Sequence, residues 1–230
     1  MLEEAKKADL RVKIDQAKAI VFDLDGTLLN TIDDLAIACN FALESLGFPS
    51  RNLDEVRSYV GNGVPKLLER ALPTGVEIDD TLRRSLLEKF NEYYFAHCKD
   101  FTHEYEGISE LVETLKSKNK LLMVLTNKIE FAAKIIIEHY FPNAFVVIAG
   151  DNPEWSLKPN PKRLLAIISE IGVSSEEVIL IGDSDTDVKT AINGNCTGIA
   201  VSWGYRSREV LQESAAEYIV DSVGEILELL

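Results

Sequence analysis

The sequence predicts an α/β protein built on a doubly wound parallel sheet, with an all-helical domain inserted after the first strand. Two observations predict it. Short apolar runs alternate with segments in which apolar residues recur every three or four positions, as in buried parallel strands joined by helices. One long segment, residues 31–105, has only the helical spacing. We therefore expect an α/β core of residues 1–30 and 106–230 and a helical domain of residues 31–105.

Six apolar runs are the expected strands. The first covers residues 17–22 and stops at Asp23, where polar residues and a glycine indicate a turn. Helical spacing fills the gaps between the later runs, for example over residues 108–115 and 164–171. The other five expected strands cover residues 120–125, 144–149, 178–181, 198–201 and 218–220.

The inserted segment reads as helices throughout. Its first helix begins near Ile32, and Gly47 followed by Pro49 ends it. Pro65 suits the first position of a later helix. Because the segment leaves after the first strand and returns near residue 106, it could lie over the carboxyl ends of the strands. Residues 1–16 form an N-terminal extension.

Composition and charge exclude several classes of protein. The net charge is −14 and the pI is near 4.7, so the surface repels nucleic acid backbones and anionic lipids. The apolar runs are far shorter than the roughly 18 residues of a membrane span, and the first twenty residues lack the apolar stretch of a signal peptide. We expect a cytoplasmic protein, monomeric or homodimeric. Its three cysteines, Cys39, Cys98 and Cys196, are too widely spaced for a disulfide framework or a zinc site.

Polar residues follow the apolar runs at the ends of the expected strands. Ligands of open parallel sheets bind at the carboxyl ends of the strands. We therefore expect these side chains to converge on one edge of the sheet. They are Asp23, Asp25, Thr126, Asn127, Lys158, Asp183 and Asp187.

The charge of such a pocket predicts what it binds. Four carboxylates and one ammonium group leave a net charge of −3, and like charges about 4 Å apart repel by about 4 kcal/mol per pair at an effective dielectric constant near 20. A hard divalent cation with oxygen ligands lowers this to −1, and one protonated Asp brings it to zero. We therefore predict a magnesium ion. A metal-loaded, near-neutral pocket with Lys158 and Thr126 suits a phosphoryl group. Asp23 could attack its phosphorus, and Asp25 could act as acid and base.

Four motifs occur in an order that resembles the haloacid dehalogenase superfamily. They are Asp23-Leu24-Asp25-Gly26-Thr27-Leu28, Thr126-Asn127, Lys158-Pro159-Asn160-Pro161 and Gly182-Asp183-Ser184-Asp185-Thr186-Asp187. The resemblance spans residues 21–191 and implies a Rossmann-like core. An Asp at the second acidic position of the first motif, Asp25, resembles the phosphatase and phosphomutase branches.

The resemblance implies roles for the acidic residues. Asp23 would be the nucleophile and Asp25 the acid and base. Magnesium would be held by the Asp23 carboxylate, the Asp25 backbone carbonyl and Asp183.

It also implies roles for the residues around the phosphoryl group. Thr126 and Asn127 would bind that group, and Lys158 would hold it beside the nucleophile. Asp187 would support Lys158 or a metal-bound water.

The inserted helices resemble the superfamily's first class of cap domain, which closes over the site and selects the substrate. Tyr59-Val60-Gly61-Asn62-Gly63-Val64 and Ser202-Trp203-Gly204-Tyr205 are similar to phosphoglycolate phosphatases. We therefore expect a magnesium-dependent phosphatase that converts 2-phosphoglycolate to glycolate and phosphate through a phospho-aspartyl intermediate. Expected substrate contacts are Gly61, Asn62, Gly63, Lys66 and Arg70. At Asn30-Thr31 the chain departs from the usual Asp-Ser or Asp-Thr pair.

Three alternatives stay open at this point. A β-phosphoglucomutase-like phosphomutase or a pyrophosphatase would use the same core. A receiver-like phospho-acceptor domain also pairs acidic residues with Thr and Lys, although Asp25 and the helical domain argue against it. Each polar residue alone also has a simpler explanation, because Asp residues often end turns or begin helices.

Overall fold

The computed structural model describes residues 3–230. The chain forms two compact units, one of Met1–Leu29 with Glu104–Leu230 and one of Asn30–His103. We call them the core unit and the helical unit. Within the described residues, none of the helices combines the length and hydropathy that crossing a bilayer requires.

The core unit is built on a six-stranded sheet in the order β5-β4-β1-β6-β7-β8. All five neighbouring pairs are parallel, so the predicted doubly wound sheet is confirmed. The central strand is buried along its whole length, which explains its unbroken apolar run. The strands are β1 (Ala19–Phe22), β4 (Leu121–Ile129), β5 (Val147–Asp151), β6 (Val178–Gly182), β7 (Thr197–Val201) and β8 (Tyr218–Val220).

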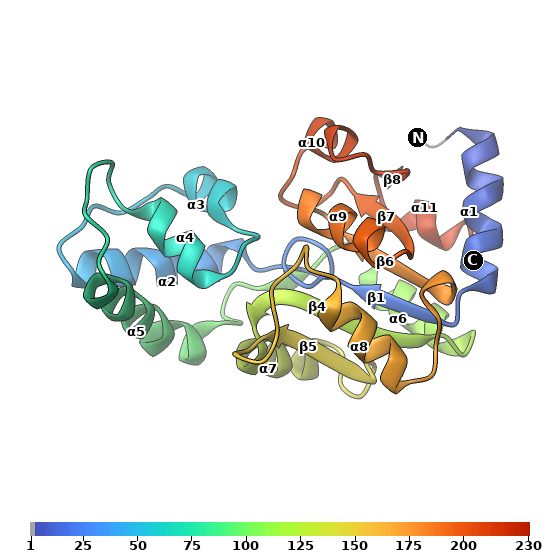
Figure 1. The fold of residues 1–230 in the computed structure, drawn as a ribbon, viewed down its shortest axis with the longest axis horizontal. Helices are drawn as coiled ribbons and strands as arrows, with labels where there is room; N and C mark the ends of the chain where they lie inside the picture. The colour runs from blue at the N-terminus through green and yellow to red at the C-terminus, as the bar shows by residue number, and fades with distance from the viewer. Residues whose placement is uncertain (1–2) are drawn as a thin grey trace. The chain divides into compact units, whose positions relative to one another are not determined.

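Helices cover both faces of this sheet. In Figure 1, α8 and α9 lie in front of the sheet, and α6 and α7 lie behind it. Leu164 and Ile167 of α8 pack in one apolar cluster with Ala19 and Val21, the alternate residues of β1. The helices are α6 (Ile108–Ser117), α7 (Glu130–Tyr140), α8 (Lys162–Glu170), α9 (Asp185–Asn193), α10 (Arg208–Glu213) and α11 (Val223–Leu227), with a 3₁₀ turn at Ser175–Glu177.

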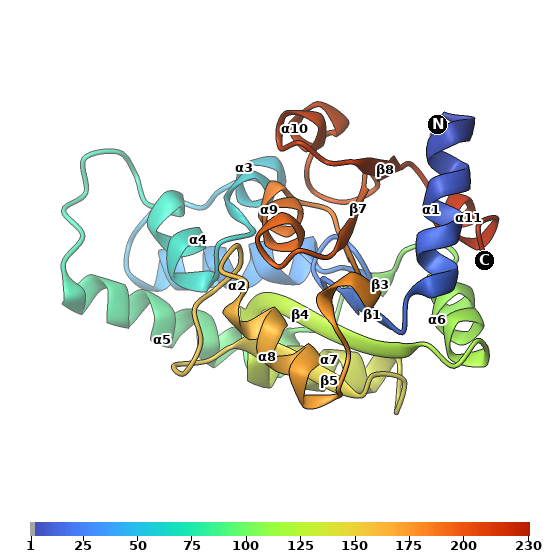
Figure 2. The same ribbon diagram turned by 45° about the vertical axis from the view of Figure 1, so that its right-hand side comes forward.

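The N-terminal extension is a helix of the core unit, α1 (Glu4–Gln16). Leu10 and Ile14 on this helix are buried. The ammonium group of Lys120 donates to the carbonyl oxygen of Ile14 at 2.9 Å, which satisfies a carbonyl at the carboxyl end of the helix. Figures 1 and 2 both show α1 alongside α11. The N-terminal extension therefore packs against the core unit and contributes buried residues to it.

Two strands differ from their predicted bounds. β4 continues past residue 125 to Ile129, with a shift in its register against β5 between Leu125 and Ile129. β5 begins at Val147, because Ala144 forms a turn with Phe141 and Phe145 joins an aromatic cluster. Of the apolar run at residues 144–146, Ala144 is therefore buried without forming a strand, whereas Val146 is exposed.

The helical unit contains α2 (Ile32–Ser45), α3 (Leu53–Tyr59), α4 (Val64–Ala71) and α5 (Asp80–His97). The first helix ends before Gly47, which has a φ of +80°. Pro65 is the second residue of α4 and not the first. In the first turn of α2, buried Asp34 accepts hydrogen bonds from the backbone N–H groups of Phe101 and Thr102. This carboxylate therefore joins the two ends of the unit.

The prediction that residues 31–105 contain no strand was wrong by one short element. β2 (Leu29–Asn30) and β3 (His103–Glu104) form a two-stranded sheet where the chain passes between the units. Each strand has two residues, too few to show an alternating pattern in the sequence.

Candidate active site

The predicted polar residues gather at the carboxyl ends of β1, β4 and β6. Successive strands are added outward from β1 on one side and from β6 on the other, so the strand order reverses between these neighbours. Such a switch point is where open parallel sheets bind ligands. Asp23 and Asp25 follow β1, and Asp183 follows β6. We call this region the carboxyl edge.

Lys158 lies between two carboxylates. Its Nζ is 2.9 Å from Oδ1 of Asp23 and 2.6 Å from Oδ1 of Asp187. The lysine side chain is only 3% exposed. Burial alone would lower the pKa of Lys158, but the charges of Asp187 and Asp23 outweigh it and raise that pKa. Lys158 is therefore an ammonium group at neutral pH.

The turn after β1 and the loop after β7 hold Asp183. Its Oδ1 accepts a hydrogen bond from the Thr27 hydroxyl at 3.1 Å, and its Oδ2 accepts one from the backbone N–H of Tyr205 at 2.7 Å. A Cβ on Gly26 would lie 2.4 Å from Oδ2 of Asp183, and one on Gly204 would lie 2.3 Å from the Asp183 Cβ. Both glycines are therefore needed for this close approach. The sequence motif Ser202-Trp203-Gly204-Tyr205 thus contacts a carboxylate of the site.

Asp23, Asp183 and Asp187 form an acidic cluster in which one carboxylate oxygen of each lies within 4.8 Å of the others. Burial, followed by the charge of Asp187, raises the pKa of Asp23 to about 8 and that of Asp183 to about 7. These carboxylates lack enough positive charge around them, and oxygen donors of this kind suit a hard divalent cation. The acidic cluster therefore fits such an ion.

Within the acidic cluster, Asp187 is the residue most engaged by the protein. Its Oδ1 accepts from Lys158, and its Oδ2 accepts from the backbone N–H and hydroxyl of Ser184 at 3.1 and 2.6 Å. This leaves Asp23 and Asp183 as the better carboxylate donors for a cation. Asp187 instead fixes Lys158, one of the two roles expected for it.

Sequence reasoning missed Lys128. Its Nζ is 2.7 Å from Oδ1 of Asp25, and the two side chains are 1% and 13% exposed. With this second ammonium group, the four carboxylates carry a net charge of −2 and not −3. With a divalent cation bound, the sum is zero when all four carboxylates are ionised. The available signal was position, because Lys128 directly follows Thr126-Asn127.

Asn127 and Thr126 both bind backbone groups at this edge. The side-chain oxygen of Asn127 accepts from the backbone N–H of Lys158 at 2.8 Å, and its NH₂ group donates to the Lys158 carbonyl at 3.1 Å. The Thr126 hydroxyl accepts from the backbone N–H of Lys128 at 3.2 Å. Asn127 thus holds the loop that carries Lys158. The expected contacts of Thr126 and Asn127 with a phosphoryl group stay a prediction.

The side chains of Asn62, Lys66 and Arg70, three of the expected substrate contacts, are bound by other residues of the helical unit. Arg70 donates to the Tyr59 carbonyl and to Oδ1 of Asn62, both at 2.8 Å. Lys66 pairs with Glu69 at 2.6 Å. Both glycines of Gly61-Asn62-Gly63 have positive φ, +120° and +81°. Arg70 therefore fixes this turn, and Lys66 is paired with a carboxylate of the chain itself.

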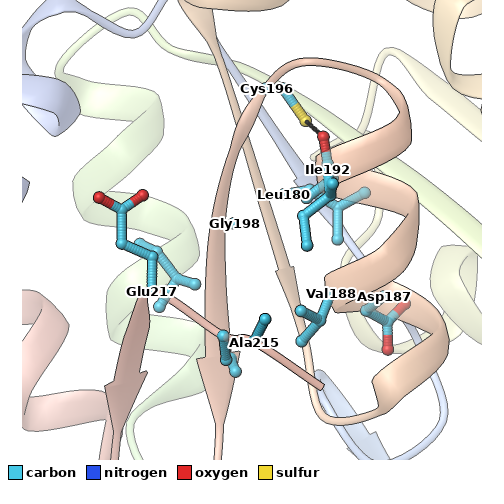
Figure 3. A pocket seen from close by; sticks show the side chains of 12 residues that line it. Leu180, Asp187, Val188, Ile192, Cys196, Gly198, Ala215 and Glu217 are labelled. Carbon is cyan, nitrogen blue, oxygen red and sulfur yellow. Dashed lines mark hydrogen bonds between the residues drawn. The ribbon is translucent and has the colours of Figure 1, made fainter. Parts of the chain in front are cut away.

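A second cavity, of about 60 Å³, is lined by residues of α9, β7 and the segment that precedes β8, and it shares Asp187 with the acidic cluster (Figure 3). Of its lining residues only Asp187 and Glu217 carry charge, and both are acidic. Cys196 also lines it, and burial raises the pKa of this thiol to about 12. Cys196 forms no disulfide, and neither do the buried Cys39 and Cys98. A cavity without a cationic side chain is a poor phosphate site, so the carboxyl edge is the candidate active site.

Comparisons with known proteins agree with this geometry. A family model described as haloacid dehalogenase-like hydrolase matches residues 20–201. A curated phosphoglycolate phosphatase of Vibrio parahaemolyticus is 33% identical over 218 residues, which cover 93% of this chain and 96% of that protein.

Solved structures give the same result. A predicted phosphoglycolate phosphatase from Haemophilus somnus superimposes with a TM-score of 0.87 at 27% identity, covering 93% of this chain and 98% of that one. A putative phosphoglycolate phosphatase from Lactobacillus delbrueckii gives a TM-score of 0.84 at 31% identity, with coverages of 92% and 97%. The fold is thus shared with these proteins over nearly the whole chain.

Proposed function

Because this chain belongs to the haloacid dehalogenase-like hydrolases, we propose that it is a phosphatase that hydrolyses 2-phosphoglycolate to glycolate and inorganic phosphate. The curated relative from Vibrio parahaemolyticus and the structural relatives, all named for this activity, support the proposal. They match nearly the whole chain, helical unit included. The site must therefore break a phosphate ester bond and release both products.

The first step transfers the phosphoryl group to Asp23. A carboxylate oxygen of Asp23 attacks phosphorus, and the bond between phosphorus and the glycolate oxygen breaks. Asp25 gives its proton to the departing oxygen. The Lys158 ammonium group, 2.9 Å from Asp23, offers a positive charge to the transferring phosphoryl oxygens. The product of this step is a phospho-aspartyl enzyme.

The second step returns the enzyme to its starting state. A water molecule attacks the phosphorus and gives a proton to Asp25, which is now the base. The bond between phosphorus and Asp23 breaks, and inorganic phosphate leaves. Both residues recover their original protonation states, so the two steps balance.

Magnesium is the cofactor that we propose for the acidic cluster. The carboxylates of Asp23 and Asp183 and the backbone carbonyl of Asp25 would hold it. When bound, the ion supplies positive charge that stabilises the phosphoryl oxygens. The raised pKa values of Asp23 and Asp183, caused first by burial, support a cation at this position.

The single observation that carries the proposal is the contact between Asp23 and Lys158. A nucleophile for phosphorus and a cation for phosphoryl oxygens lie 2.9 Å apart, both buried, at the switch point of the sheet. Four further expectations stay predictions. They are the role of residues 31–105 as a cap domain, the cytoplasmic location, the oligomeric state, and the substrate contacts at Gly61, Asn62, Gly63, Lys66 and Arg70.

A panel of phosphate compounds with and without Mg²⁺ tests the proposal. We expect phosphate release from 2-phosphoglycolate to be fastest and to require the divalent ion. Equal rates across the panel would indicate a general phosphatase without a preference for 2-phosphoglycolate. Interconversion of glucose phosphates would favour a phosphomutase, and preferred cleavage of pyrophosphate would favour a pyrophosphatase. A stable phospho-enzyme with no product release would favour the receiver-like alternative.

A further inference from the structure

Lys128 is a buried cation that the proposed steps do not use. Its side chain is 1% exposed, and its ammonium group lies 2.7 Å from Oδ1 of Asp25. Removing an ammonium group from water costs several kcal/mol, and an apolar side chain of similar volume is often at least as stable at such a place. The stability of the fold alone therefore does not explain why a lysine occupies position 128.

The backbone around Lys128 is held from two sides. The Thr126 hydroxyl accepts from its N–H at 3.2 Å. On the neighbouring strand β5, a Cβ on Gly150 would lie 2.7 Å from the Lys128 carbonyl oxygen, so β5 approaches Lys128 as closely as only a glycine allows. The register shift of β4 between Leu125 and Ile129 also lies here, and such irregularities redirect side chains near active sites. The backbone that carries the buried side chain of Lys128 therefore has a defined position.

We propose that Lys128 is a positioning residue, which holds the carboxyl group of Asp25 through Oδ1 in the orientation that exchanges a proton with the substrate. This inference rests on the proposed function, because it assigns Asp25 the acid and base role. A carboxyl group on a turn has free rotation about two bonds, and an acid that is misplaced by about 1 Å can lose on the order of 10²-fold in rate. One short ion pair to a fixed ammonium group removes that freedom.

The test compares two esters that need the acid to different degrees. Glycolate leaves as a strongly basic alkoxide and needs a proton from Asp25, whereas p-nitrophenolate leaves without one. The quantity kcat/KM reports the steps up to the phospho-aspartyl enzyme. For Lys128→Met we expect kcat/KM to fall about 10²-fold with 2-phosphoglycolate and to stay within about threefold with p-nitrophenyl phosphate.

The second step gives an independent signature. Both esters pass through the same phospho-enzyme, whose hydrolysis needs Asp25 as base. In Lys128→Met we expect kcat to fall to one common value for the two esters, with a burst of p-nitrophenol equal in amount to the enzyme. A merely structural loss would not produce a burst. Lys128→Arg, which keeps a cationic donor, should recover part of the activity with 2-phosphoglycolate.

The matched control is Lys116→Met, which removes an exposed lysine that pairs with Glu113 at 2.8 Å on α6. Lys116→Met should leave kcat/KM unchanged with both esters. Circular dichroism should show that both Met variants are folded. Equal falls in kcat/KM for the two esters, or no fall for 2-phosphoglycolate, would overturn the inference while leaving the proposed function intact. A wild-type enzyme inactive on both esters would overturn the proposed function and the inference with it.

Discussion

The core unit and the helical unit both contain many charge pairs, yet the pairs differ in their surroundings. At the carboxyl edge, the side chains of Lys128 and Lys158 are 1% and 3% exposed. In the helical unit, Lys66 is 59% exposed where it pairs with Glu69 at 2.6 Å. The pairing distances are alike, 2.6–2.9 Å in all three cases.

This difference in burial indicates which charged residues are retained for function. An exposed pair contributes about 0–1 kcal/mol, because water screens it and two long side chains lose freedom. A buried pair carries a large desolvation cost, and removing one partner leaves an uncompensated charge. The buried charges at the carboxyl edge are therefore costly to the fold, and chemistry is the reason to keep them. Four substitutions or conditions test that contrast, from the largest expected effect to the smallest.

Asp23→Asn should have the largest effect on turnover. An amide cannot attack phosphorus as a carboxylate does, so we expect steady-state activity with 2-phosphoglycolate to fall by at least about 10⁴-fold. The melting temperature at pH 8 should not fall, because the substitution removes a negative charge from the acidic cluster. Appreciable turnover in this variant would refute the role of Asp23.

Lys158→Met should reduce both activity and stability. It removes the cation between Asp23 and Asp187, so activity should fall about 10²- to 10³-fold and the free energy of unfolding by about 3–5 kcal/mol. Lys66→Met is the exposed counterpart and should change the free energy of unfolding by less than about 1 kcal/mol. Denaturant unfolding of both variants measures the two changes in the free energy of unfolding. Similar losses in the two variants would contradict the comparison between the units.

Gly204→Ala should displace Asp183. The new Cβ would lie 2.3 Å from the Asp183 Cβ and 2.4 Å from the Gly26 carbonyl oxygen. We expect activity to fall about 10²-fold and stability by about 1–3 kcal/mol. Gly224→Ala is the control, since its nearest neighbour would be Ser222 Oγ at 3.7 Å. Wild-type activity in Gly204→Ala would show that the loop after β7 does not set the position of Asp183.

The effect of Mg²⁺ on stability should depend on pH. The pKa of Asp23 is raised to about 8 and that of Asp183 to about 7, so between about pH 4 and 8 the folded protein binds more protons than the unfolded chain. Without a divalent ion, stability therefore falls as pH rises through this window. Because Mg²⁺ binds the ionised carboxylates, it should raise the melting temperature more at pH 8 than at pH 5. Equal shifts at both pH values would contradict this account of the acidic cluster.

Much of the fold was predictable because its central strands are buried on both faces. β1 and β6 appear in the sequence as unbroken apolar runs, and the predicted fold class is confirmed. The family is confirmed as well, and the curated relative from Vibrio parahaemolyticus carries the activity that the motifs predicted. By contrast, alternating charges concealed the buried face of α1, which contributes Leu10 and Ile14 to the core.

The site was predictable where a residue follows the end of an apolar run. Asp23 and Asp183 meet that condition. Lys128 does not, because β4 continues through three polar residues that the apolar pattern places outside the strand. The pairing of Asn127 with the backbone of Lys158 could not be predicted either, since it joins segments 31 positions apart through a loop without periodicity.

The central claim is that Asp23 carries the phosphoryl group during turnover. Acid quenching of the enzyme during steady-state turnover of 2-phosphoglycolate, followed by borohydride reduction, would convert a phosphorylated aspartate to homoserine, which peptide mass spectrometry locates. The account predicts homoserine at position 23 in the wild-type enzyme. Homoserine at another aspartate, or intact Asp23 while Lys128→Met accumulates phospho-enzyme, would contradict it.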